Sequence, residues 1–510
     1  MAAAVWSVDP RTGREREQVA VEASGAEVDQ AVRAAHAARS ALADREVRAA
    51  LLRAAADRLD GARAHLVEAA DAETALGPVR LDGELTRTTG QLRSFAALAE
   101  EGAFLDARID HADPAAVPPV PDLRRMRIPL GVVAVYAAGN FPFAFSAPGG
   151  DTASALAAGC PVVIKAHPDH PATSELTLAL LRRAAADTGV PPECLGLVHG
   201  FDAGVALIGH PLVTAVGFTG SVRGGRALFD AAAARPVPIP FHGELGSLNP
   251  VLVTPGAAAE RAEEVARGLA ASVTLGTGQF CVKPGLVLVP AGEAGDRLVT
   301  ALTAAVSDTE AGVLLDARIR DAFLAGVGER AALDGVESPV TPGAAGEHTV
   351  AAGFLTVAAG RLAAPGPHDL LLEECFGPVT VLARYAGPAE AGELLARLPG
   401  NLTATLHLSG AEERGEGGAA ALLERLTRLA GRVVVGGWPT GVAVADAQHH
   451  GGPYPAATST ATSVGTAAVE RWLRPVAYQT TPQALLPPEL RDGNPLGLPR
   501  HVDGRAENGA

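Results

Sequence analysis

A single cysteine in a loop of small residues is the first candidate for chemistry. Cys281 lies in the segment 276–285, which reads GTGQFCVKPG. Glycine has no β-carbon, so the backbone of such a loop can come close to a bound molecule. A lone cysteine is usually a small buried apolar residue, but this loop has little side-chain bulk with which to bury one. The residues alone therefore leave a reactive thiolate and an inert cysteine equally open.

A second segment offers the partner that a reactive thiol would need. Residues 241–250 read FHGELGSLNP and hold Glu244 between Gly243 and Gly246. A thiol nucleophile needs a nearby base, or a base that activates water for a second step. The two segments together favour covalent catalysis, with Cys281 as the nucleophile and Glu244 as the base.

The motifs Gly-Gln-Phe-Cys and Glu-Leu-Gly resemble those of the aldehyde dehydrogenase superfamily. The wider wording narrows the resemblance to the NADP-type α-ketoglutaric semialdehyde dehydrogenase branch, and it extends over roughly residues 20 to 505. The stretches that carry it are GQFCVKPGL, GNFPFAFS, GGDTASALAAGCPVV and the late HGGPYP.

The resemblance implies the oxidation of an aldehyde to a carboxylate. Cys281 would attack the carbonyl carbon and form a thiohemiacetal, which loses a hydride to the cofactor and becomes a thioester. The developing oxyanion needs preorganised donors. By analogy these are the side-chain amide of Asn140 and the backbone N–H of Cys281, and Glu244 would activate the water that hydrolyses the thioester.

Cofactor-binding residues are also implied by the resemblance. Gly220 and Ser221 would contact the pyrophosphate, Lys165 the adenosine ribose and Glu374 the nicotinamide ribose, while Phe376 would pack by the nicotinamide. From the residues alone, a Gly/Ser turn at a helix N-terminus favours a phosphate, but a plain turn has the same pattern, and the usual GxGxxG fingerprint is absent.

The resemblance predicts NADP as the cofactor, with NAD possible. NAD-preferring relatives often carry a glutamate three residues after the lysine, where it repels a 2′-phosphate. Pro168 stands there in this chain. His167 is a candidate to assist, or a histidine on a surface loop.

The hydrophobic pattern predicts an α/β fold. Helical spacing dominates from Ser24 to about Ala99, beginning with a capping box at Ser24 and Glu27. Short apolar strands then alternate with helices, which implies a parallel sheet whose ligands bind beyond the carboxyl ends of the strands. The predicted strands are 132–135, 161–164, 195–198, 215–218, 251–253 and 286–289.

We expect the aldehyde-dehydrogenase-like arrangement of a Rossmann-type cofactor domain, an α/β catalytic domain and a small oligomerisation arm. Residues 291–372 have helical patterning and carry no motif. The predicted units are residues 1–109 and 130–244 for NADP binding, residues 245–470 for catalysis, and residues 110–129 and 471–510 for the arm and an irregular, Pro-rich C-terminal extension.

Composition excludes several classes of protein. A formal net charge of −15 disfavours nucleic acid and anionic membranes as partners, and no apolar stretch is long enough for a membrane helix. Residues 1–7 do not read as a signal peptide, and four widely spaced cysteines indicate reduced thiols in a cytoplasmic protein. His449 and His450 lack the spacing of a zinc motif, so no metal is predicted.

Other functions share part of this pattern. A CoA-acylating relative often lacks the glutamate base, a structural protein on this fold would be free to lose the site residues, and a thiol hydrolase would need no cofactor. The expected substrate is α-ketoglutaric semialdehyde, with fatty or other aliphatic aldehydes as the alternative. Lys283 and Arg93 are candidates for binding the far carboxylate of that substrate, with a plain surface role the alternative for both. The expected assembly is a homodimer or homotetramer.

Overall fold

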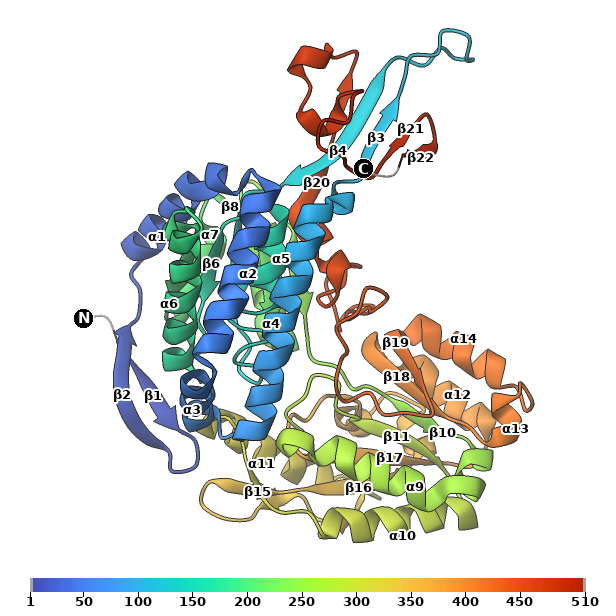
Figure 1. Ribbon diagram of the computed structural model, residues 1–510. Coiled ribbons are helices and arrows are strands. Elements are labelled where there is room, and N and C mark those ends of the chain that lie inside the picture. The colour runs from blue at the N-terminus through green and yellow to red at the C-terminus, as the bar shows by residue number, and fades with distance from the viewer. Residues whose placement is uncertain (1–2, 508–510) are drawn as a thin grey trace.

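The computed structural model describes residues 3–507 and builds them around two mainly parallel sheets with a projecting arm (Figure 1). Residues 1–2, which begin the first predicted unit, and residues 508–510, which end the last, lie outside the described residues. The predicted α/β architecture is confirmed. Among the described residues, no helix is both long and apolar enough to cross a membrane.

The first sheet has the order β7-β6-β5-β8-β9, and every neighbouring pair is parallel. Its strands confirm the four predicted for this half of the chain and add β9. The carboxyl ends of these strands lead to Asn140, Lys165, Gly220 and Glu244, so one edge of the sheet gathers most of the predicted site. The strands are β5 (Val132–Tyr136), β6 (Val162–Lys165), β7 (Leu195–Val198), β8 (Val213–Thr219) and β9 (Phe241–Glu244).

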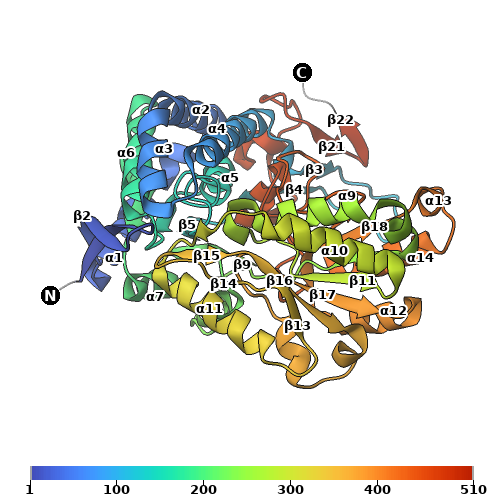
Figure 2. The ribbon, with the colours of Figure 1, turned by 90° about the horizontal axis from the view of Figure 1, so that it is seen from below.

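Helices cover both faces of this sheet because alternate residues of its central strand point to opposite sides. Val133 and Val135 of β5 pack in one core and Val132 and Ala134 in the other. Figure 2 shows the helices of the first core stacked beside the sheet. The first core includes α2 (Arg45–Gly61), α4 (Pro78–Glu101), α5 (Gly150–Ala158) and α6 (Pro171–Asp187), and the second includes α1 (Gly25–Ala38), α7 (Phe201–Gly209) and α8 (Val222–Ala233).

The second sheet has the order β13-β16-β17-β11-β10-β18-β19 and is parallel except for β13. The strands β10 (Val251–Val253) and β11 (Leu286–Pro290) confirm the predicted strands, and the helix α9 (Pro255–Thr274) lies between them in the chain. Its other strands are β13 (Glu337–Val340), β16 (Gly353–Ala358), β17 (Val379–Tyr385), β18 (Asn401–His407) and β19 (Ala430–Val435). The helices α9 and α10 (Glu293–Ser307) pack on one face, and α12 (Pro388–Arg397) and α14 (Ala419–Leu429) on the other.

The prediction of helical structure for residues 291–372 was wrong in part. The segment contains α10 and α11 (Ala317–Ala331), but it also contains β12 (Gly312–Val313), β13, β14 (Gly343–Ala344), β15 (Thr349–Ala351) and β16. Strand β16 is buried and lies between β13 and β17. Pairing with distant strands decides its conformation, and local Ala/Gly-rich composition does not report that pairing.

The arm is a sheet of order β20-β4-β3-β21-β22 that projects from the body (Figure 1). Strand β4 (Leu123–Pro129) lies in the segment 110–129 that was predicted to belong to the arm. The prediction of an irregular C-terminal extension was wrong where β20 (Leu473–Gln479) pairs with all of β4. Trp472, buried beside α5, donates a 2.8 Å hydrogen bond to Ser154 and anchors the start of β20. The remaining strands are β3 (Ala107–Asp110), β21 (Arg500–Val502) and β22 (Arg505–Glu507).

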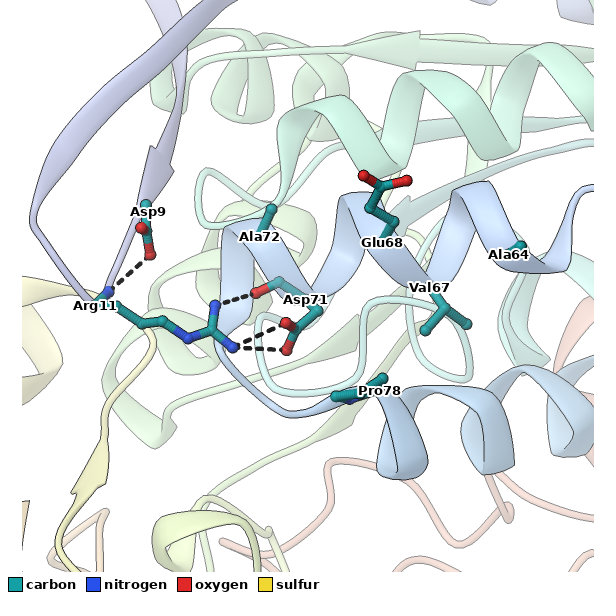
Figure 3. A pocket seen from close by; sticks show the side chains of 8 residues that line it. All are labelled: Asp9, Arg11, Ala64, Val67, Glu68, Asp71, Ala72 and Pro78. Carbon is teal, nitrogen blue, oxygen red and sulfur yellow. Dashed lines mark hydrogen bonds and ion pairs between the residues drawn. The ribbon is translucent and has the colours of Figure 1, made fainter.

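The N-terminal segment adds a hairpin that the sequence pattern did not predict. Strands β1 (Ala4–Asp9) and β2 (Arg14–Val21) precede the predicted capping box, which is confirmed. Arg11 in the hairpin turn donates to the carbonyl and carboxylate of Asp71 on α3 (Arg63–Thr74), beside a surface cavity of about 500 Å³ (Figure 3). A half-exposed pair of this kind contributes at most ~1 kcal/mol, so the contact positions the hairpin and supplies no chemistry.

Candidate active site

The loop before Cys281 has an unusual backbone that brings it against a second turn. Gly276, Thr277 and Gly278 all have positive φ, at 55°, 57° and 67°. A β-carbon at Gly278 would collide with the Gly377 carbonyl oxygen, so only glycine allows the two turns to meet. Gln279 then anchors the loop, because its Oε1 accepts a 2.9 Å hydrogen bond from the backbone N–H of Leu315. Cys281 follows this anchor and is half-buried.

Glu244 ends β9, and its side chain is buried. Its Oε2 accepts a 2.6 Å hydrogen bond from the hydroxyl of Ser463, and its Oε1 lies 2.9 Å from Nε2 of His450. The strand itself is held by pairing with β8, where Gly220 N–H donates to the Glu244 carbonyl oxygen at 3.1 Å. The base and the proposed phosphate turn are therefore joined through one backbone hydrogen bond.

His450 completes a group that the motif analysis missed. Its ring is buried, and the same Nε2 that faces Glu244 lies 3.7 Å from Sγ of Cys281. Ligand atoms of Cys281, Glu244 and His450 all lie within 4.8 Å of one another. The available signal was the HGGPYP segment, which had contributed only to the resemblance. The three ligand atoms are close enough for a metal ion, and the expected absence of one stays a prediction.

Burial and the neighbouring charges shift the pKa values of Cys281 and Glu244 in opposite directions. Burial raises the pKa of Cys281 well above its usual value, and the negative charge of Glu244 raises it further. Burial also acts to raise the pKa of Glu244, but the positive charge of a protonated His450 ring, the hydrogen bond that this ring then donates and the hydrogen bond from Ser463 hold that pKa below its usual range. The resting pair is thus a neutral thiol beside a carboxylate, and a thiolate needs a neighbouring positive charge.

Two donors are available for an oxyanion beside the sulfur. Nδ2 of Asn140 donates one hydrogen bond, at 3.0 Å, to the carbonyl oxygen of Gln279, which places the amide beside the cysteine loop. Within the described part of the chain, the second hydrogen of this amide remains free to donate to an oxyanion. The backbone N–H of Cys281 has no acceptor among residues 3–507. Arg80 secures this arrangement by donating to the Asn140 carbonyl oxygen at 2.6 Å.

Asn249 ties the glutamate segment to the cysteine loop, and no motif singled it out. Its Nδ2 donates to the carbonyl oxygens of Cys281 and Lys283 at 2.8 and 3.0 Å. Its own backbone has φ 52°, an uncommon conformation that asparagine tolerates better than most residues. The segments that carry Glu244 and Cys281 are therefore held together by one buried amide.

The turn with Glu374 and Phe376 lies on the other side of the site. The carboxylate of Glu374 lies over Gly246, where a β-carbon would collide with it. Burial raises the pKa of Glu374 to about 7, and the Lys283 ammonium opposes that rise. Glu374 is also close enough to Cys281 to raise the pKa of the thiol. Phe376 is half-buried on the same turn.

The remaining predicted cofactor residues lie along the edge of the first sheet. Ser221 caps α8, accepting a 3.2 Å hydrogen bond from Gly224 N–H, and it is exposed together with Gly220. Lys165 ends β6 with its ammonium 4.8 Å from the ring centre of the exposed Phe201, and burial lowers its pKa to about 8. An exposed helix N-terminus beside an apolar surface and an ammonium fits a dinucleotide.

Comparison with known proteins agrees with this geometry. The family model described as "Aldehyde dehydrogenase family" matches residues 2–407. The chain belongs to the aldehyde dehydrogenase family. It is 47% identical to α-ketoglutaric semialdehyde dehydrogenase 2 of Azospirillum brasilense, over 90% of this chain and 87% of the relative. It is 43% identical to α-ketoglutaric semialdehyde dehydrogenase of Acinetobacter baylyi, over 94% and 91% of the two chains.

A solved structure supports the fold of this aldehyde dehydrogenase. A putative aldehyde dehydrogenase from Burkholderia cenocepacia superposes with a TM-score of 0.79 at 22% identity and covers 96% of both chains. The predicted family and the predicted aldehyde-dehydrogenase-like fold are confirmed, and the chain is an oxidoreductase of this family. The roles of individual residues, and the predicted domain boundaries, stay predictions.

Neither residue expected to bind the substrate's far carboxylate is placed to do so. Lys283 is only 3% exposed, and its ammonium donates to the carbonyl oxygens of Cys375 and Val379. Arg93 lies on the outer side of α4, paired with Asp57 and Asp60 of α2. Lys283 is a buried structural cation, so neither the substrate role nor the surface role predicted for it is right. Arg93 forms a surface ion pair, which is the alternative that the sequence left open for it.

The first prediction concerns the charge of Glu244. Glu244→Gln removes a negative charge that raises the pKa of Cys281, so the pKa falls and the thiolate fraction near pH 8 rises. We expect alkylation of Cys281 by iodoacetamide in the free enzyme to become about tenfold faster, which corresponds to one pKa unit. Glu373→Gln, at an exposed neighbour of Glu374, serves as the control, and an unchanged or slower rate for Glu244→Gln would contradict the electrostatic argument.

The second prediction concerns His450. His450→Gln removes the ring nitrogen that can receive the thiol proton, so the first turnover should slow about 100-fold. Stopped-flow measurement of reduced cofactor gives this rate directly. The adjacent, half-buried His449 offers a matched control, His449→Gln, which should keep the wild-type rate. A fast first turnover in His450→Gln would mean that the thiol loses its proton by another route.

Proposed function

We propose that this enzyme oxidises α-ketoglutaric semialdehyde to 2-oxoglutarate with a nicotinamide dinucleotide, through covalent catalysis at Cys281. The substrate is supported by the printed names of the two relatives at 47% and 43% identity. The covalent route is supported by one observation above all, the 3.7 and 2.9 Å separations of His450 Nε2 from the sulfur and from Glu244.

Acylation begins with proton transfer from the thiol. With the His450 ring in the tautomer that carries its proton on Nδ1, the S–H bond of Cys281 breaks as Nε2 gains the proton. The carboxylate of Glu244, 2.9 Å from Nε2, then accepts a hydrogen bond from it and stabilises the imidazolium. The thiolate attacks the aldehyde carbon. The aldehyde oxygen then becomes an oxyanion, held by Nδ2 of Asn140 and the backbone N–H of Cys281. A bound nicotinamide supplies the acceptor for the hydride.

Deacylation needs a base that faces water near the thioester. Glu244 has a lowered pKa and is therefore a carboxylate at neutral pH, able to take a proton from water. The hydroxyl of Ser463 occupies Oε2, which leaves Oε1 and its neighbour His450 facing the sulfur. Water attacks the thioester carbon, the C–S bond breaks, and the carboxylate product leaves.

The third prediction separates these two steps. Glu244→Gln keeps His450 and the oxyanion donors, so it should release a burst of reduced cofactor and then turn over at least about 100-fold more slowly than the wild-type enzyme. Rapid-quench mass spectrometry should detect the acyl group on Cys281. Absence of a burst would show that Glu244 is not specifically a deacylation base.

NADP is the proposed cofactor, with NAD accepted. Pro168 leaves the position three residues after Lys165 without a carboxylate, and the Lys165 ammonium is available to a 2′-phosphate. His167 is less suited to assist, since burial lowers its pKa well below the usual value and its Nδ1 accepts from Asp169 N–H. Glu22 opposes the preference for NADP, because its carboxylate would repel a 2′-phosphate. Its side chain lies against Gly200, and its charge interacts with that of Lys165.

The fourth prediction tests substrate and cofactor together. A panel of kcat/KM values should favour α-ketoglutaric semialdehyde over pentanal by about 100-fold, and NADP over NAD. Lys165→Met should lower the NADP-to-NAD ratio about tenfold, because it removes the cation that the 2′-phosphate would meet. Equal values for both aldehydes would refute the proposed substrate, and an NAD preference in the wild-type enzyme would refute the proposed cofactor.

Aliphatic aldehydes are the second candidate, and an aromatic wall is compatible with them. Phe141 makes edge-to-face contacts with Phe145 and Phe280 at 5.3 and 5.4 Å between ring centres, next to Cys281. Such a wall accommodates the methylene groups of either substrate. The same panel, extended to longer alkanals, distinguishes the two.

Assembly and location complete the proposal. We infer a homodimer or homotetramer formed through the arm, because its sheet projects from the body and ends in the unpaired edges of β20 and β22. A cytoplasmic location is supported only by the free cysteines Cys160, Cys194, Cys281 and Cys375. The negative charge supports an enzyme without nucleic-acid partners.

A further inference from the structure

The helix α4 presents a column of charged side chains toward the active site. Arg80, Glu84 and Arg87 are spaced by four and three residues, so they share one face. Glu84 is buried, and its Oε1 accepts hydrogen bonds from the backbone N–H groups of Phe143 and Ala144 at 2.8 and 2.9 Å. The column is thereby fixed to the segment that carries Asn140 and the aromatic wall.

Arg87 stands out in this column because it lacks a partner. Its Nε and Nη2 are buried without an acceptor among residues 3–507, and no ion pair involves it there. The other two arginines of α4 are engaged, Arg80 with the Asn140 carbonyl and Arg93 with two aspartates. A buried guanidinium without an acceptor is costly, and such a cost is often compensated by a ligand.

Arg87 is also close to the reacting groups. Its guanidinium lies 5.2 Å from the ring centre of Phe145, whose ring lies 6.2 Å from that of His450. His450 in turn contacts Cys281. The charge of Arg87 interacts with those of Cys281, Glu244 and Glu84, although burial still lowers the pKa of the arginine. Between this guanidinium and the sulfur of Cys281 lie the Phe145 ring and the His450 ring, and the guanidinium is near enough for its charge to act on the thiol.

We propose that Arg87 binds the far carboxylate of the substrate and so selects short aldehydes that end in a carboxylate. This rests on the proposed function and deepens it. Arginine presents its donors in a planar fork that matches a carboxylate. Phe145 contacts the methylene groups between the two ends, and Arg80, held between Phe141 and Phe280, positions the aromatic wall.

The test uses the ratio of kcat/KM for α-ketoglutaric semialdehyde to that for pentanal, which has the same chain length and no carboxylate. Arg87→Met should lower this ratio about 100-fold, mainly through a higher KM for the semialdehyde. Arg87→Lys should give an intermediate ratio, because it keeps the charge and loses the fork. Arg93→Met, on the same helix, should keep the wild-type ratio.

Each alternative outcome has a distinct reading. Equal losses for both aldehydes in Arg87→Met would mean that the arginine acts on the Cys281 thiolate, and an unchanged ratio would mean that another group binds the carboxylate; either overturns the proposal. A wild-type enzyme without preference for the semialdehyde would instead refute the proposed function.

A second measurement needs no variant at position 87. In the wild-type enzyme, glutarate should protect Cys281 from iodoacetamide at least tenfold better than glutaramide, its uncharged analogue. Equal protection by the two compounds would overturn the assignment even if Arg87→Met failed to fold.

Discussion

The site depends on one imidazole nitrogen that lies between a thiol and a carboxylate. In the proposed mechanism the Cys281 thiolate and the Glu244 carboxylate are both anions, and both occupy a poorly solvated space where two negative charges repel strongly. His450 Nε2 is within reach of each, at 3.7 and 2.9 Å, and can carry the balancing positive charge. Without a cation at that point, the same burial that excludes water would keep the thiol protonated.

That geometry is built from segments far apart in the sequence. Glu244 ends a strand of the first sheet, Cys281 follows a helix of the second, and His450 lies in a late loop beside Ser463. Polar contacts hold these segments in register. Ser463 bonds both Glu244 and the backbone of His450, while Asn249 bonds the carbonyl of Cys281. The network is not fully satisfied, because Nδ1 of His450 has no hydrogen-bond partner among residues 3–507, but its bonds still link the three segments.

The sequence predicted those parts of the molecule whose structure is decided locally. Strands such as 195–198 and 251–253 are confirmed because short apolar runs between turn signals suffice to form them. Strand β16 and the pairing of β20 with β4 were not predicted, because distant partners decide them. His450 was missed for the same reason: adjacent histidines have no spacing that reports a carboxylate two hundred residues earlier in the chain. Lys283 has the positive charge that a substrate carboxylate would need, but its ammonium already donates hydrogen bonds to two backbone carbonyl oxygens.

The charged column of α4 shows how stability and function diverge in this fold. Three ionisable side chains on one helical face, two of them arginines with buried unbonded nitrogens, are a poor choice for packing against a neighbouring segment. Two backbone hydrogen bonds to Glu84 offset part of the free-energy cost of burying its carboxyl group. The bond to the Asn140 carbonyl and the contacts with two aromatic rings do the same for Arg80. For Arg87, the compensating contact within residues 3–507 is with the ring of Phe145. Buried donors without a partner concentrate where a ligand completes the structure, and here the unpaired donors of Arg87 are separated from His450 by the ring of Phe145.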